Sequence, residues 1–114
     1  MRWITIVDVC IAYRYIAYMI ENFASQMAED IFDGINSRYA RQFPMALHEK
    51  VRRRLDQLNA ATMIETLRIP PSNKLAKLEG DLKDFWRIKI DKQWAIIFMW
   101  DAGMAFNVDI IDYH

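Results

Sequence analysis

The sequence has little of what cross-links a chain, loosens it or carries it through a membrane. Its one cysteine, Cys10, cannot form an internal disulfide, so nothing indicates an oxidising compartment. Glycine and proline occur three times each, which excludes collagen-like and low-complexity chains. There is no run of about eighteen uncharged apolar residues, so we expect no transmembrane helix. Asp8 interrupts the stretch where a signal peptide would be apolar, and we therefore expect a cytoplasmic protein.

Net charge is also absent, because fifteen basic residues balance fifteen acidic ones. The charges are unevenly distributed along the chain. Residues 38–54 carry six basic residues and the single acid Glu49, residues 68–92 carry seven basic residues and four acids, and residues 101–112 carry acids only. Phosphate binding depends on local positive charge, so the neutral total does not exclude a nucleic-acid partner.

The 114 residues, 54% of them hydrophobic, suit one globular domain with its own core. A first amphipathic helix is predicted by apolar residues that recur every four positions: Met27, Ile31, Ile35 and Tyr39. A second helix, starting near Pro44, is predicted by Leu47, Val51, Leu55 and Leu58. We expect a third, short helix at Thr62, because Thr62 and Glu65 have capping-box spacing. The segment 70–73 is then a loop.

From Asp84 onward the apolar residues alternate, which indicates β-strands. A first strand is predicted around Ile88, and the apolar run 94–100 is typical of a central strand buried on both faces. Residues 91–92 can form a tight turn. Asp101-Ala102-Gly103 is a hairpin turn signal, and Phe106, Val108 and Ile110 alternate with polar residues after it. Short turns require antiparallel neighbours, so helices followed by a meander predict an α+β class.

The N-terminal part of the chain does not fit one pattern. Residues 19–23 are a candidate for a further strand, and Met19 is a candidate start of the domain. The domain then spans 19–114, and residues 1–18 are an extension of open role. Their apolar residues suit a strand as well as they suit a helix.

The usual signatures of cofactor and metal chemistry are missing. Metal sites need three or four ligands at suitable spacing, which His48, His114 and Cys10 do not provide. There is no Gly-rich phosphate loop and no nucleophile elbow. We therefore expect no cofactor and no metal. We expect His48 to be a surface or packing residue, and the three tryptophans of the strand segments to belong to the core.

Asp112-Tyr113-His114 places a carboxylate, a phenol and an imidazole in consecutive positions. Histidine exchanges a proton near neutral pH, and tyrosine can donate one. Cleavage of RNA by its own 2′-OH requires a base, an acid and cations for the phosphorane charge. Taken alone, these residues are more simply interpreted as a polar tail.

Five segments, in order from about Met19 to the last residue, resemble segments of HigB-type toxins in the RelE/ParE superfamily. They are the helix end Leu58-Asn59-Ala60-Ala61-Thr62, the loop 70–75 with Leu78-Glu79-Gly80-Asp81-Leu82-Lys83 after it, the strand segments Phe85-Trp86-Arg87-Ile88 and Gln93-Trp94-Ala95-Ile96-Ile97-Phe98, and the closing segment 108–114. Each segment alone has little specificity, but five in the right order are fairly specific.

The resemblance implies a RelE-like fold, with two N-terminal helices packed on a curved antiparallel sheet of about four strands. It implies an mRNA endonuclease that cuts translated message on the ribosome, and a HigA-like helix-turn-helix antitoxin as partner. Carried over, His114 has a proton-transfer role, Tyr113 supports or orients the substrate, and Asp112 orients its neighbours or orders the strand end.

Three positions depart from the pattern of the family. Ala95 stands where the strand motif usually has an arginine that stabilises the scissile phosphate, Ala76 stands where some members have histidine, and Glu79 stands where they have lysine. A lost transition-state donor typically costs about 10²–10³ in rate. The substitute cations we consider are Lys74, Lys77, Lys83, Arg87 and Lys89.

Two other functions are compatible with the same fold. One is a non-catalytic module that only binds a HigA-like partner, which the departures and the zero net charge favour. The other is a ParE-like gyrase inhibitor, since a fold does not fix a function. The D-Y-H terminus argues against the second.

Overall fold

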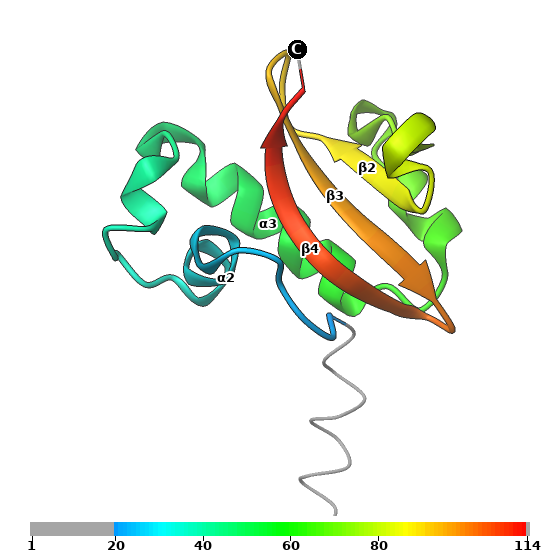
Figure 1. Cartoon of the computed structure of the whole chain (residues 1–114), viewed down its shortest axis with the longest axis horizontal. Coiled ribbons are helices and arrows are strands. Elements are labelled where there is room, and N and C mark those ends of the chain that lie inside the picture. Colours follow the sequence, from blue (N-terminus) through cyan, green and yellow to red (C-terminus); the bar gives the residue numbers. More distant parts are fainter. Residues whose placement is uncertain (1–19, 114) are drawn as a thin grey trace, which may run out of the picture.

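The computed structural model describes residues 20–113. Two α-helices lie against one face of a four-stranded sheet (Figure 1). The helices are α2 (Gln26–Asp33) and α3 (His48–Ala60), and the strands are β1 (Ala76–Lys77), β2 (Phe85–Lys89), β3 (Trp94–Asp101) and β4 (Met104–Asp112). Short 3-10 helices occupy the connections: η1 (Ala40–Gln42), η2 (Met45–Leu47), η3 (Ile64–Arg68), η4 (Pro71–Asn73) and η5 (Gly80–Leu82).

The strands follow the order β1-β2-β3-β4, and every neighbouring pair is antiparallel. The α+β class and the RelE-like arrangement are thereby confirmed. The β3–β4 hairpin turns at Ala102 and Gly103, which both have positive φ, as tight hairpin turns require. Strand β3 pairs with β2 on one side and with β4 on the other, so it lies inside the sheet, as its apolar run predicts.

The core lies between the helices and the facing side of the sheet. Ile88, Ile96 and Phe98 face Val51 and other apolar residues of the helices, and all of these side chains are fully buried. Trp86, Trp94 and Trp100 pack against this core, as the sequence predicts. Burial of such side chains is the main favourable contribution to folding, at roughly 1.5–3 kcal/mol each.

The first helix is shorter than its pattern predicts. It ends at Asp33, because Gly34 adopts the left-handed conformation (φ +75°) and its N–H bonds back to the carbonyls of Asp30 and Ile31. Ile35, 52% exposed, and Tyr39, 38% exposed, therefore lie outside the helix and outside the core. The prediction of a helix through Tyr39 is wrong because the C-cap glycine overrides the apolar spacing.

The second predicted helix is present, and the third is replaced by a 3-10 helix. Pro44 precedes η2, which leads directly into α3, so the chain turns helical where the proline predicts. Thr62 does not cap a helix. Met63 occupies the N-cap position of η3 without a side-chain hydrogen bond, and the capping-box prediction is therefore wrong.

A β-bulge in β4 changes which residues share a face. Ile97 pairs with Asp109 but Met99 pairs with Phe106, so one residue has been inserted on β4. Asn107, with φ +51°, takes up the insertion. Phe106 consequently lies on the face opposite to Val108 and Ile110, although the simple alternation predicts one face for all three. The alternation rule fails here because a bulge breaks the period of two.

Residues 20–24 run parallel to β4 along its free edge. Ile20 and Phe23 form isolated bridges to Ala105 and Val108, so this segment is a partial strand, and residues 1–18 lie outside the described residues. The side chains of Asn22 and Asn107 are hydrogen-bonded (Nδ2–Oδ1 2.7 Å), and the Asn107 N–H donates to Asn22 Oδ1 (3.1 Å). The bulge is thereby attached to the segment that covers the edge.

Candidate functional site

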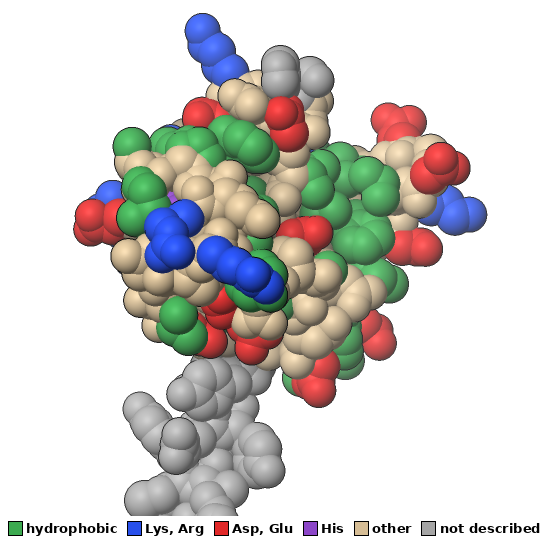
Figure 2. Space-filling view, turned by 60° about the vertical axis from the view of Figure 1, so that its left-hand side comes forward, with side chains coloured by type: hydrophobic (Ala, Val, Ile, Leu, Met, Phe, Trp, Pro, Cys, Tyr) green, Lys and Arg blue, Asp and Glu red, His purple; other side chains and the backbone are tan. Residues whose placement is uncertain are grey.

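The face of the sheet opposite α2 and α3, here called the open face, carries polar and apolar side chains in register. Residues paired directly across antiparallel strands point to the same face. The rows of the open face are Phe85–Met99–Phe106, Ala76–Arg87–Ile97–Asp109 and Lys89–Ala95–Ile111, and Tyr113 follows Ile111 two residues later. In Figure 2, hydrophobic side chains gather on this side of the molecule beside a projecting group of acidic and basic side chains.

Tyr113 is held against the β2–β3 turn by both its backbone and its side chain. Its N–H donates to the carbonyl of Gln93 (2.9 Å), and its hydroxyl donates to the carbonyl of Asp91 (3.1 Å). The end of the described chain therefore lies beside that turn (Figure 1). The structure thus fixes Tyr113 in place and does not leave it as a frayed tail.

Arg87 extends across the open face toward the same chain end. Its guanidinium carbon lies 5.7 Å from the centroid of the Tyr113 ring, within the range of a cation–π contact. Its Nε is buried, and within residues 20–113 it has no hydrogen-bond partner. A buried donor without an acceptor is costly.

Asp112 lies on the other face of β4, in register with Trp94. Its Oδ2 accepts a hydrogen bond from Gln93 Nε2 (2.9 Å). Tyr113 also bonds the backbone of Gln93, so one residue of the turn holds two consecutive residues of the chain end. This contact suits the strand-ordering role expected for Asp112.

Asp91 stabilises the turn to which the chain end is attached. Its Oδ1 accepts from the backbone N–H groups of Gln93 and Trp94, both at 2.8 Å. The hydrogen bond from Trp94 lowers the pKa of Asp91 below its usual range, and the bond from Gln93 and the charge of Lys50 act in the same direction. The ionised carboxylate is thus the form that the fold prefers.

The positions of the missing family side chains lie on the open face. Ala95 is fully buried between Lys89 and Ile111 in its row, and Ala76 pairs with Arg87. Both positions therefore adjoin Arg87 or Lys89, and they offer methyl groups in place of a cation or an imidazole. Glu79, the third departure, is exposed just before η5.

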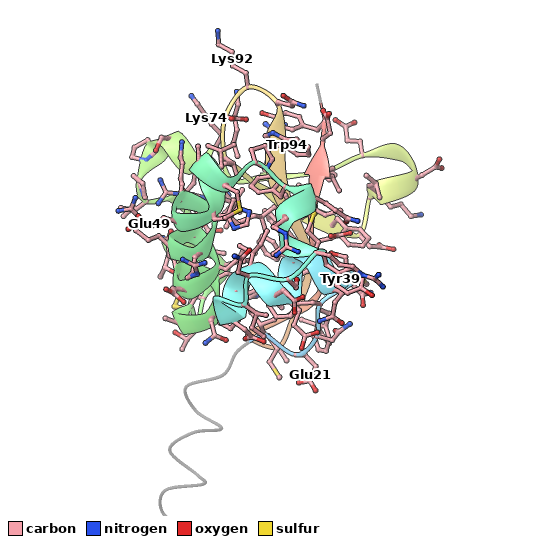
Figure 3. All side chains as sticks on the ribbon, turned by 90° about the vertical axis from the view of Figure 1, so that its left-hand side faces the viewer. Glu21, Tyr39, Glu49, Lys74, Lys92 and Trp94 are labelled. Carbon is pink, nitrogen blue, oxygen red and sulfur yellow. The ribbon has the colours of Figure 1, made fainter. Side chains whose placement is uncertain are left out.

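The candidate cations are divided between different parts of the surface. Arg87 and Lys89 lie on the open face, whereas Lys77 lies on the other face with its Nζ 5.7 Å from the Trp86 ring centroid. Lys74, which follows η4 with φ +48°, and Lys83, which follows η5, are exposed. Figure 3 places Lys74 at the same end of the molecule as Lys92 and Trp94. The structure therefore brings two of the five cations onto the face of Tyr113.

His114 lies outside the described residues. His48 is a packing residue, as the sequence predicts: it is buried, its Nε2 lies 3.0 Å from the Phe43 carbonyl, and its ring stacks on Phe43. Within the described part of the chain, no group of three or more His, Cys, Asp or Glu is arranged to hold a metal. Nor does any helix there have the length and apolarity to cross a membrane.

Asp91 and Gln93 are the contributors that the sequence analysis did not identify. Aspartate at the first position of a tight turn accepts backbone N–H groups, so the Asp91-Lys92 signal could have indicated the support. Nothing in the sequence shows that Gln93 reaches Asp112, nineteen positions away. Phe106 was also assigned to the wrong face, because the bulge is not visible in the pattern.

Known proteins match this chain over most of its length. The family model described as HigB-like toxin, a RelE-like toxin of the type II toxin-antitoxin system HigB, matches residues 21–114. Toxin HigB-1 of Vibrio cholerae serotype O1 is 40% identical over 67 residues, which cover 59% of this chain and 70% of that protein. An uncharacterized protein of Haemophilus influenzae is 33% identical over 67 residues, 59% of this chain and 66% of that protein. With this match and a RelE-like fold, the chain belongs to the family of HigB-like toxins of type II toxin-antitoxin systems.

Proposed function

We propose that this protein is a ribosome-dependent mRNA endonuclease that inhibits translation in the cytoplasm. A HigA-like helix-turn-helix antitoxin is its proposed partner, and the ribosome with its message is its target. The observation that carries the proposal is the placement of Arg87. Its guanidinium lies over the Tyr113 ring beside the chain end, on the same face of the sheet as Lys89.

The chemistry needs a proton acceptor, a proton donor and a cation near one phosphate. In the proposed mechanism His114 accepts the proton of the 2′-OH and then gives it to the departing 5′-oxygen, while Arg87, assisted by Lys89, stabilises the charge on the phosphorane. Tyr113 orients the substrate and does not transfer the proton, because its hydroxyl already donates to the Asp91 carbonyl. Asp112 orders the strand end through Gln93. Arg87 thereby supplies the positive charge that other members of the family have from an arginine at the position of Ala95.

The test is cleavage of a translated mRNA on ribosomes, with the 5′ ends mapped by primer extension. Arg87→Gln should lower the single-turnover rate by about 10²–10³, because one preorganised donor is lost. Arg87→Lys should retain part of the rate. Lys77→Gln is the matched control, since it removes a charge of the same sign from the opposite face. Equal rates for Arg87→Gln and Lys77→Gln would exclude Arg87 as the cation.

The terminal residues are tested in the same assay with His114→Ala and Tyr113→Phe. His114→Ala should abolish cleavage, and Tyr113→Phe should reduce it less, because only the bond to Asp91 is lost. If both variants cleave like the parent, the catalytic assignment of the terminus is wrong.

A non-catalytic, antitoxin-binding module is the second candidate function. Ala76 and Ala95 favour it, because both positions on the open face carry methyl groups. A stable complex with a HigA-like protein, together with no cleavage of any translated message, would support this alternative against the first.

A further inference from the structure

The row Phe85–Met99–Phe106 is an apolar surface separate from the core. It crosses β2, β3 and β4 on the open face, and all three side chains are half-buried. None of them belongs to the core cluster or to the side chains packed against it. The bulge at Asn107 is what turns Phe106 to this face. Bulges that redirect a side chain are frequent beside functional sites.

The next row along the strands is cationic at its centre. Arg87 follows Phe85 by two residues, which is about 6.6 Å along a strand, and Lys89 follows by two more. The Nε of Arg87 is buried and lacks a partner in the described part of the chain. One face therefore carries an aromatic surface, a guanidinium and an ammonium group in succession.

This succession matches a nucleotide better than it matches a protein side chain. A nucleotide joins a flat apolar base to an anionic phosphate, and proteins bind it with aromatic rings beside cations. Asp109 is the acid in the Arg87 row, but its Oδ1 accepts from Ser25 (2.7 Å) and from the backbone of Ile110 (2.8 Å). These hydrogen bonds hold the Asp109 Oδ1 at the edge beside residues 20–24.

We infer that Phe106, with Phe85 beside Met99, stacks on a base of the RNA whose phosphate Arg87 contacts. The inference rests on the proposed function, because it places the base next to the proposed scissile phosphate. Stacking acts mainly on binding. Phe106 is therefore a substrate-positioning residue whose loss affects KM more than kcat.

The experiment uses the full chain and a short RNA that contains 2-aminopurine and a 2′-deoxy sugar at the cleavage position. Stacking quenches 2-aminopurine fluorescence, and the missing 2′-OH prevents cleavage. Phe106→Leu keeps an apolar side chain without a ring, and we expect it to weaken binding about five- to a hundredfold and to remove the quenching. Phe106→Trp should restore both. Met63→Ala, which alters another exposed apolar residue, should leave both unchanged.

A parallel measurement of cleavage on ribosomes separates the two proposals. Cleavage by the parent together with equal KM and equal quenching for Phe106→Leu would overturn the stacking role and leave the proposed function standing. No cleavage by the parent, with quenching that depends on Phe106, would reject the endonuclease and retain the base-binding surface. If Phe106→Leu weakens only a HigA-like partner and not the RNA, the row is a protein interface and the inference is wrong. Thermal unfolding of each variant controls for folding.

Discussion

The two faces of the sheet are built from the same strands but carry different kinds of side chains. On the helix face Ile88, Ile96 and Phe98 are buried in a continuous apolar core. On the open face the neighbouring positions hold Arg87 and Ala95. Close packing determines the helix face, where a change of one methylene affects stability. On the open face we expect the charges of Arg87 and Lys89 to matter for function.

The difference shows where stability and function are separated in this fold. A residue on the helix face contributes to stability through contacts that already exist. The open face instead carries the charged groups of Arg87 and Lys89, whose proposed partner is the phosphate of a bound RNA. We therefore expect variants on the two faces to affect different measurements.

The largest effect is expected from Phe98→Ala on the helix face. Phe98 is fully buried and lies edge-on to Trp100, so its truncation leaves a cavity and should cost about 3–5 kcal/mol of unfolding free energy. Phe106→Ala removes the same atoms from the open face and should cost less than half as much, because Phe106 is partly exposed. Urea unfolding measures both. Equal losses would show that the two faces are equally well packed.

The next effect is a gain of function from Ala95→Arg. This change adds a cation beside Lys89 on the open face and should raise the cleavage rate by about 10–10². Ala95 is 0% exposed, so the longer side chain should also lower stability by roughly 1–3 kcal/mol. Ala95→Met is the control for length without charge. If Arg and Met give the same rate, the cationic role belongs to other residues of this face.

A smaller effect is expected at the β2–β3 turn, to which the chain end is attached. Asp91→Ala removes the acceptor of two backbone N–H groups and should lower stability by about 1–2 kcal/mol. Asp91→Asn keeps an oxygen in place and should lose less. Thermal unfolding compares the variants, and the fluorescence of Tyr113→Trp in each background reports on the attached terminus. An unchanged melting temperature for Asp91→Ala would contradict the role of the turn.

The smallest effect is the dependence of this turn on acid. The pKa of Asp91 is lowered in the fold, chiefly by the hydrogen bond from Trp94. Its contribution is therefore present above the unfolded pKa of about 4 and is lost as pH falls through the lower folded value. The stability difference between the parent and Asp91→Asn should shrink below about pH 4 and stay constant from there to neutral pH. A difference that instead grows in acid would reverse the assigned sign.

The sequence by itself determined the class of the fold and the central position of β3. Apolar alternation at Ile88 and the continuous run of β3 reflect burial that any arrangement of these strands must satisfy. The ordered motifs also identify the family from the sequence alone. Where local chemistry competes with the pattern, as at Gly34, the pattern predicted the helix end wrongly.

Only the tertiary structure decided which side chains share the open face. The face of a strand residue depends on its register with a partner strand, and one inserted residue at Asn107 turned Phe106 away from Val108. In the same way, the pairing of β2 with β3 places Arg87 on the face of Tyr113, and the pairing of β1 with β2 places Lys77 on the other face. These relations join residues far apart in the chain. The local sequence therefore determines the helices, the strands and the types of side chain. Strand pairing and the bulge determine which of these side chains lie together on the open face.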